Sequence, residues 1–112
     1  MVFHAQADTD VKRASVNATS SGNTQIVALV ANKKIRVLWV LATNRDVTVV
    51  NVKFQSNTTD ISGAHQLAVS GGGFSLNAAP GYYCQTVAGQ ALNVNLSGNS
   101  DVLVDVGYLE VT

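Results

Sequence analysis

Apolar and polar residues alternate along several stretches of this chain, and the alternation constrains its fold more than any other feature. The stretch 91–97 reads ALNVNLS, with Leu92, Val94 and Leu96 on one side and amide or hydroxyl side chains between them. A period of two is typical of a strand with one buried face, whereas an amphipathic helix repeats every 3.6 residues. No stretch keeps helical spacing for three turns, and the abundant valines and threonines favour strands. The sequence therefore predicts an all-β protein.

Turn-forming Asn, Gly and Ser residues divide the chain into about nine short strands, at the spacing typical of sandwiches and barrels. We expect strands at residues 11–18, 24–30, 35–42, 47–55, 65–69, 74–78, 83–87, 91–97 and 101–111. With 112 residues in all, this predicts one domain over residues 11–112, preceded by an N-terminal arm of residues 1–10. The expected architecture is an antiparallel two-sheet β-sandwich of the jelly-roll type. A Greek-key sandwich of the immunoglobulin type is the alternative, weakened because the Cys–Trp–Cys arrangement is missing.

Charge and cysteine content exclude several classes of protein. Seven Lys or Arg residues balance seven Asp or Glu residues, so the broad basic surface of a nucleic-acid-binding protein is not expected. A single cysteine rules out an internal disulfide and a zinc site built from several thiolates. No apolar run approaches the roughly 20 residues of a membrane span, and the first residues lack the pattern of a secretory signal. We therefore expect no nucleic-acid partner and no membrane partner.

The titratable residues do not follow the spacing of a catalytic or metal-binding motif. His4 and His65 have no acidic or thiol partner within a few residues, and Cys84 has no basic neighbour to lower its pKa. Asp101 and Asp105 share one face of a strand but lie about 13 Å apart, too far for the paired carboxylates of a glycosidase. We therefore expect a protein that is not an enzyme and has no catalytic residues, cofactor or metal. A small enzyme or a calcium-binding, lectin-like domain remains an alternative, and it would be recognised by carboxylates that converge in the folded protein.

Two of the expected strands, 35–42 and 101–111, carry apolar side chains on both faces, so each face needs a cover. Trp39, inside the first strand, is expected to belong to the core more often than to a binding surface. A neighbouring subunit is the simplest cover for the faces that the domain's own core does not use. Tyr82 and Tyr83, close to the only proline, are the better candidates for an exposed aromatic patch. The expected interface between subunits consists of Leu103, Leu109, Trp39, Tyr82 and Tyr83.

Several blocks of sequence, taken in order, are similar to one protein family. The blocks are KIRVLWVLA, VTVVNVKFQSNTTDISGAHQLA, GGGF, AAPGYY, TVAGQALNVNLS and VGYLEV, and they lie within residues 24–112. In this order they resemble a family of small virion β-proteins encoded by phages and prophages. Where that family has Pro-Tyr-Asn-Pro followed by Gly-Trp-Phe, this chain has Leu-Asn-Ala-Ala-Pro-Gly-Tyr-Tyr at residues 76–83.

The resemblance implies a single jelly-roll domain with a structural role in the virion, and capsid decoration (cement) is the favoured role. Such a protein is expected to be a homotrimer that binds the major capsid protein of a phage head. It would be made in the host cytoplasm and located on the capsid surface. Val2, Phe3 and His4 of the arm are the expected capsid-binding residues. The alternative is a receptor- or carbohydrate-binding module of a phage tail fibre or spike, which would group exposed aromatic side chains with Asn, Asp and Gln in one pocket.

Overall fold

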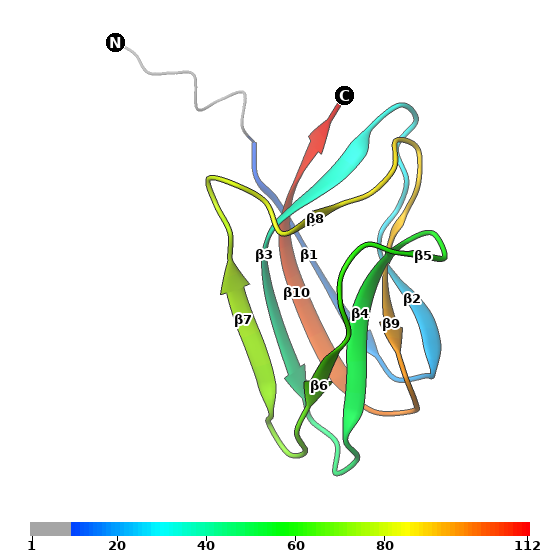
Figure 1. The fold of residues 1–112 in the computed structure, drawn as a ribbon, viewed down its shortest axis with the longest axis vertical. Coiled ribbons are helices and arrows are strands. Elements are labelled where there is room, and N and C mark those ends of the chain that lie inside the picture. Colours follow the sequence, from blue (N-terminus) through cyan, green and yellow to red (C-terminus); the bar gives the residue numbers. More distant parts are fainter. Residues whose placement is uncertain (1–9) are drawn as a thin grey trace.

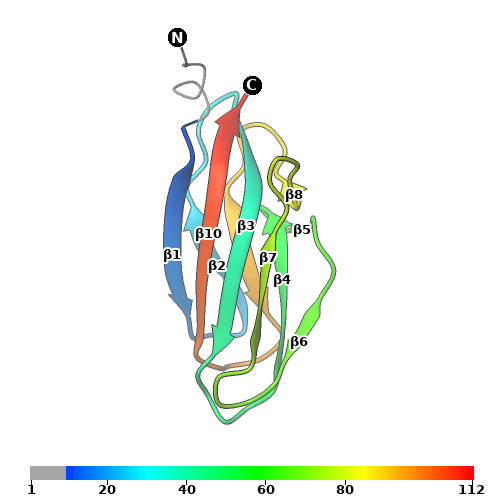
Figure 2. The same cartoon turned by 90° about the vertical axis from the view of Figure 1, so that its left-hand side faces the viewer.

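Ten strands form two antiparallel sheets in the computed structural model, which describes residues 10–112 (Figure 1). The strands are β1 (Lys12–Ala18), β2 (Gly22–Val27), β3 (Lys34–Asn44), β4 (Val50–Ser56), β5 (Thr59–Asp60), β6 (His65–Leu67), β7 (Gly73–Asn77), β8 (Cys84–Gln85), β9 (Leu92–Leu96) and β10 (Val102–Val111). The sheet that faces the viewer in Figure 2, called the front sheet, has the order β1–β10–β3–β7, and the short β8 also pairs with β3. The back sheet has the order β2–β9–β4–β5, and β6 also pairs with β4.

The strand pairs are nested along the chain. β1 pairs with β10, β2 with β9, β3 with β7 and β8, and β4 with β5 and β6. The chain therefore runs as one long folded ribbon that is wound across both sheets, with the first and last strands side by side (Figure 2). This is the jelly-roll arrangement of an all-β sandwich, as the sequence predicts.

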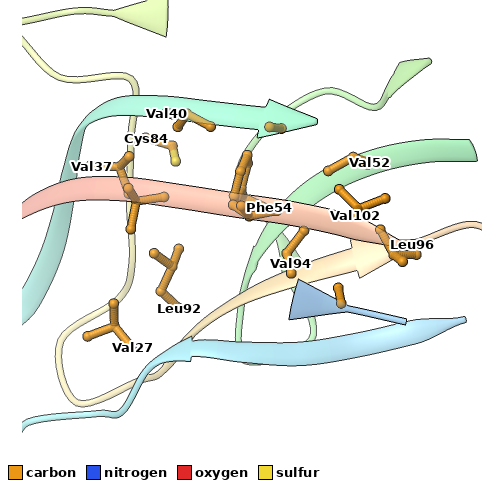
Figure 3. Close-up of a cluster of buried hydrophobic side chains, with 14 of the residues drawn as sticks. Val27, Val37, Val40, Val52, Phe54, Cys84, Leu92, Val94, Leu96 and Val102 are labelled. Atoms are coloured by element: carbon orange, nitrogen blue, oxygen red, sulfur yellow. The ribbon is translucent and has the colours of Figure 1, made fainter. Parts of the chain in front are cut away.

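Apolar side chains of every second residue fill the space between the two sheets (Figure 3). In β9, Leu92, Val94 and Leu96 are at most 1% exposed, and the inward residues of β10 up to Val106 are fully buried. Phe54 of β4 is the largest of the fully buried side chains. Burying a side chain of this kind stabilises a fold by about 1.5–3 kcal/mol. The alternation predicted for these strands is confirmed, and it leaves their other faces on the outside of the sandwich.

Several strand limits differ from those that the sequence predicts. The strand expected at 24–30 is β2, which begins and ends earlier, and the strand expected at 83–87 shrinks to β8. The alternation also misses β5, which follows a tight turn at Asn57, where the backbone adopts a left-handed φ of 55°. Gln55, on the solvent side of the alternation, is only 7% exposed, and its amide donates to Asp60 Oδ1 at 2.7 Å.

One buried amide fixes the loops at one end of the sandwich. Asn44, at the end of β3, is fully buried. Its Nδ2 donates to the carbonyl oxygens of Thr48 at 2.8 Å and Ala68 at 3.2 Å. Its Oδ1 accepts from Asp46 N at 3.1 Å and from Ser100 Oγ at 2.9 Å. These bonds hold the segment after β3 as a turn, so β4 begins at residue 50 and not at 47.

No helix among residues 10–112 is long and apolar enough to cross a membrane. The expected capsid-binding residues Val2, Phe3 and His4 lie outside the described residues.

Candidate functional site

The front sheet turns one face away from the core (Figure 2), and among residues 10–112 no other strand lies over that face. The strand register places Trp39 of β3 between Gly107 of β10 and Asn77 of β7. In the next row, Leu41 lies beside Ser75. We call the surface formed by Trp39, Leu41, Ser75, Asn77 and Gly107 the Trp39 platform.

The indole of Trp39 packs with the face of its ring against the backbone of Gly107. A Cβ atom added at Gly107 would lie 2.0 Å from Nε1, 2.3 Å from Cε2 and 2.6 Å from Cδ1 of the indole. Because the three distances are similar, the plane of the ring faces the glycine, and not one of its edges. Any side chain at this position would collide with the ring, so the contact requires glycine. The backbone of β10 therefore supports one face of the indole and leaves the opposite face on the outer surface.

A hollow of about 390 Å³ opens beside the indole. Its lining residues are Trp39, Val40, Leu41, Ser75, Leu76 and Asn77. Leu41 is 45% exposed and adds apolar surface, while Ser75 and Asn77 add a hydroxyl and an amide. Asn77 Oδ1 accepts from Ala79 N at 3.1 Å, which orients the amide and leaves Nδ2 as a donor. Ligand sites commonly combine apolar surface with a few placed polar groups, and this hollow has both.

A carboxylate lies on the opposite side of the platform, toward β1. Asp105 of β10 is the register partner of Leu41, and its Oδ1 accepts a hydrogen bond from Ser15 Oγ. The second oxygen of the carboxylate stays available as an acceptor. The platform therefore has an amide donor on its β7 side and a carboxylate acceptor on its β10 side.

A bulge in β3 explains why Trp39 lies outside the core. Val37 pairs with Tyr108 and Trp39 with Gly107, so Leu38 is an extra residue in the register. The bulge shifts the alternation by one residue, and Trp39 is not a member of the core cluster. The expectation that Trp39 belongs to the core is therefore wrong. It is half-buried on the outer face of the front sheet.

Leu103 and Leu109 lie on the same outer face as Trp39. They alternate with the buried residues of β10, as the sequence predicts, and both are half-buried. Leu109 is the register partner of Arg36, and Leu103 is the partner of Thr43, so the two leucines flank the row that contains Trp39 and Gly107. Three of the five residues of the expected subunit interface therefore share one surface.

Tyr82 and Tyr83 do not form one exposed patch. Tyr82 is 49% exposed, and the guanidinium carbon of Arg36 lies 4.7 Å from the centroid of its ring. Tyr83 turns inward: its ring meets Phe54 edge-on with centroids 6.1 Å apart, and its hydroxyl lies 2.9 Å from Nε2 of His65. Burial raises the pKa of Tyr83 above its ordinary value. The expected exposed pair is thus reduced to Tyr82.

The thiol and the carboxylates are separated from one another in the fold. Cys84 is buried, and burial raises the pKa of its thiol to about 12, so the thiol stays protonated at neutral pH. Asp101 lies 3.2 Å from the guanidinium of Arg45, away from the Ser15 contact of Asp105. Within residues 10–112, no three His, Cys, Asp or Glu side chains come together as metal ligands would.

The back sheet has a second, smaller hollow of about 280 Å³. It is lined by Asn51, Lys53, Ala64, Asn95 and Ser97. Two of these side chains already have partners: Lys53 Nζ lies 3.1 Å from Asp60 Oδ1, and Asn95 Nδ2 donates to Asn23 Oδ1 at 2.8 Å. None of the lining residues is aromatic. The Trp39 platform is therefore the better candidate for a ligand site.

The sequence holds one signal for the platform that the alternation does not use. Gly107 stands inside the long last strand, and a glycine in the interior of a strand often marks the close approach of another group. The group is the indole of Trp39, which is 68 positions earlier and reaches Gly107 through the pairing of β3 with β10.

No protein-family model matches this chain, and no curated protein matches it. The chain is similar to a solved structure described as "EclA C-terminal domain; sugar-binding protein", with a TM-score of 0.44 and 18% identical residues. The likeness covers 92% of this chain and 79% of that chain.

Proposed function

We propose that this chain is a carbohydrate-binding β-sandwich module and that the Trp39 platform is its binding surface. The observation that carries the proposal is the indole that packs face-on against Gly107, on a sheet face with no other described strand over it. A sugar ring has an apolar face of C–H groups, which can stack on an aromatic ring, and a rim of hydroxyls, which need hydrogen-bond partners. The platform offers the ring, the apolar Leu41, the Asn77 amide and the nearby Asp105 carboxylate.

This is the alternative function that the sequence leaves open, in which exposed aromatics are grouped with amide and carboxylate side chains. In this proposal the module has no catalytic residues, cofactor or metal of its own and serves a phage tail fibre or spike. The indole of the platform is supported on one side by the backbone of Gly107. Such a surface loses little conformational entropy when a ligand binds, because the indole is already fixed before binding.

The proposal is tested by titrating glycans into the protein while the fluorescence of its only tryptophan is recorded. A glycan that stacks on Trp39 is expected to change the emission and to saturate. Trp39→Ala is expected to weaken binding at least about tenfold, which corresponds to ~1.4 kcal/mol, as measured by calorimetry. Trp39→Phe should retain part of the affinity, because a smaller ring still stacks.

Leu29→Ala is the matched control, since Leu29 is 55% exposed and lies in the loop after β2, outside the platform. It should bind glycans as the wild-type protein does. The proposal is refuted if a broad glycan array and the titrations show no binding, or if Trp39→Ala binds as tightly as the wild-type protein.

A second candidate function is capsid decoration by a homotrimer bound to the major capsid protein. It is favoured by the apolar residues Leu41, Leu103 and Leu109, which share the outer face with Trp39. An apolar face of this kind can serve as a subunit interface as well as a ligand surface. If subunits meet there, the platform is covered and glycans cannot reach Trp39, so the two functions are distinguishable.

Leu103→Asp tests the second candidate. If the outer face joins subunits, light scattering should report a trimer for the wild-type protein and a monomer for Leu103→Asp, because a charge buried without a partner costs several kcal/mol. The circular dichroism of the variant should stay that of the folded protein. Leu29→Asp, at an exposed position, should leave the trimer intact. A wild-type monomer at micromolar concentration would rule out this trimer and leave the platform free.

A further inference from the structure

The bulge at Leu38 also brings a cation to the Trp39 platform. Arg36 and Trp39 are three residues apart, and in a regular strand an odd spacing puts two side chains on opposite faces. Their register partners on β10 are Leu109 and Gly107, which are two residues apart and therefore on the same face. The extra residue in β3 thus places Arg36 and Trp39 on one surface, roughly 7–10 Å apart along the strand.

The guanidinium of Arg36 is held in place from two directions. The ring of Tyr82 lies under it, with 4.7 Å between the ring centroid and Cζ of Arg36. Nε of Arg36 donates to Gln85 Oε1 at 2.8 Å. Within residues 10–112, no carboxylate lies within 4.0 Å of it. The two terminal nitrogens therefore keep their donors, and a guanidinium presents such donors as a fork that fits both oxygens of a carboxylate.

The charges around Arg36 favour an anion on the same side of the platform. Lys34 also occupies an outer-face position, beyond Arg36, as the partner of Val111. Arg13 lies on the outer face in the row of Trp39, across β10, as the partner of Gly107. The carboxylate of Asp105 lies one row beyond Trp39, on the side away from Arg36. One end of the platform is therefore cationic and the other acidic, which would orient a ligand that carries one negative group.

We infer that the glycan bound by the platform is acidic, with the ring of a uronic acid unit near Trp39 and its carboxylate on the terminal nitrogens of Arg36. The inference rests on the proposed function and names the class of sugar. Arg36 is fixed before binding, so the paired hydrogen bonds to the carboxylate form without ordering a mobile side chain. Neutral sugars would use the indole and Asn77 and leave Arg36 unused.

The test uses matched pairs of polymers: polygalacturonate, alginate and hyaluronate, and each polymer after reduction of its carboxyl groups to hydroxymethyl groups. The wild-type protein is expected to bind at least one acidic polymer about tenfold or more tighter than its reduced form at low salt. Arg36→Gln should bring the acidic polymer down to the affinity of the reduced one and leave the reduced one unchanged. Arg36→Lys should restore only part of the preference, because a lysine has no fork.

Arg45→Gln is the control, since it removes the same charge from the far end of β3, where Arg45 pairs with Asp101 on the surface. It should keep the preference for the acidic polymer. If the wild-type protein binds reduced and acidic polymers equally, or if Arg45→Gln loses as much affinity as Arg36→Gln, the inference is wrong and the proposed function survives. If no polymer or glycan binds at all, both the inference and the proposed function are refuted.

Discussion

Gly107→Val is expected to dismantle the Trp39 platform and to lower stability, although valine is one of the best residues for a strand. In an open strand position, exchanging glycine for valine stabilises by up to about 1 kcal/mol. Here the first side-chain atom would lie 2.0 Å from Nε1 of Trp39, so the indole must leave its place. Overpacking of this kind costs about 1–3 kcal/mol. The clash thus reverses the sign of the usual effect.

Three measurements report on the Gly107→Val change. Emission from the only tryptophan should shift to longer wavelength, because the displaced indole is exposed to water on both faces. Glycan affinity should fall at least as far as in Trp39→Ala, since the ring no longer lies beside the hollow. Chemical denaturation should give a lower free energy of unfolding than in the wild-type protein.

Gly63→Val serves as the control, because a Cβ at Gly63 would meet no atom within 4 Å and no left-handed φ restricts the position. It should leave emission, stability and glycan affinity unchanged. If Gly107→Val keeps the wild-type emission and affinity, then the support of the indole by the glycine backbone has no functional role.

The sandwich itself can be predicted from the sequence because buried and outward-facing residues alternate along each pleated strand. In β9 and in the inward residues of β10, every second residue is apolar and every one of these is buried. These strands lie in the middle of their sheets, so the core decides which face each residue takes. The limits of the shorter strands are not readable in this way. β5 and β8 are two residues long, and turns and side-chain bonds fix their ends.

The candidate site is much less readable, because it depends on which residues are neighbours across strands. Trp39 looks like a core residue as long as β3 is regular, and only the register with β10 reveals the bulge at Leu38. The same bulge puts Arg36 on the outer face beside the platform, although its spacing of three residues from Trp39 would place the two side chains on opposite faces of a regular strand. The support of the indole by Gly107 and the amide of Asn77 come from two other strands. Strand pairing in a jelly roll joins residues that are far apart in the chain, so the local sequence pattern does not predict which residues become neighbours.

The largest loss of stability is expected for Asn44→Asp, a change of one atom. The introduced carboxylate keeps the acceptor that Ser100 Oγ and Asp46 N use, but its other oxygen replaces the donor that serves Thr48 O and Ala68 O. A charged oxygen would then face two carbonyl oxygens at a site with no exposure to water. A buried charge without an oppositely charged partner costs about 3–5 kcal/mol, so the free energy of unfolding at pH 7 should fall by that amount.

The pH dependence separates this charge effect from the simple loss of hydrogen bonds. Burial and the facing carbonyls raise the pKa of the introduced carboxyl in the folded protein above the value of about 3.9 in the unfolded chain. The folded state then binds the proton more tightly, so the deficit relative to wild type grows as pH rises above about 4 and levels off above the folded pKa. Below about pH 4 the carboxyl is protonated in both states, and only the cost of the altered hydrogen bonds remains.

Asn99→Asp is the matched control for this prediction. Asn99 is exposed, and its Oδ1 accepts from Ser21 N at 2.8 Å, a bond that a carboxylate oxygen can also accept. Its free energy of unfolding should stay within about 0.5 kcal/mol of the wild-type value. Denaturant titrations at several pH values between 3 and 8 compare the two variants. Two results would contradict the prediction: equal stability of both variants at pH 7, or a loss of stability in Asn44→Asp that does not change with pH. Either would show that the Asn44 amide does not hold together the loops that contain Thr48, Ala68 and Ser100.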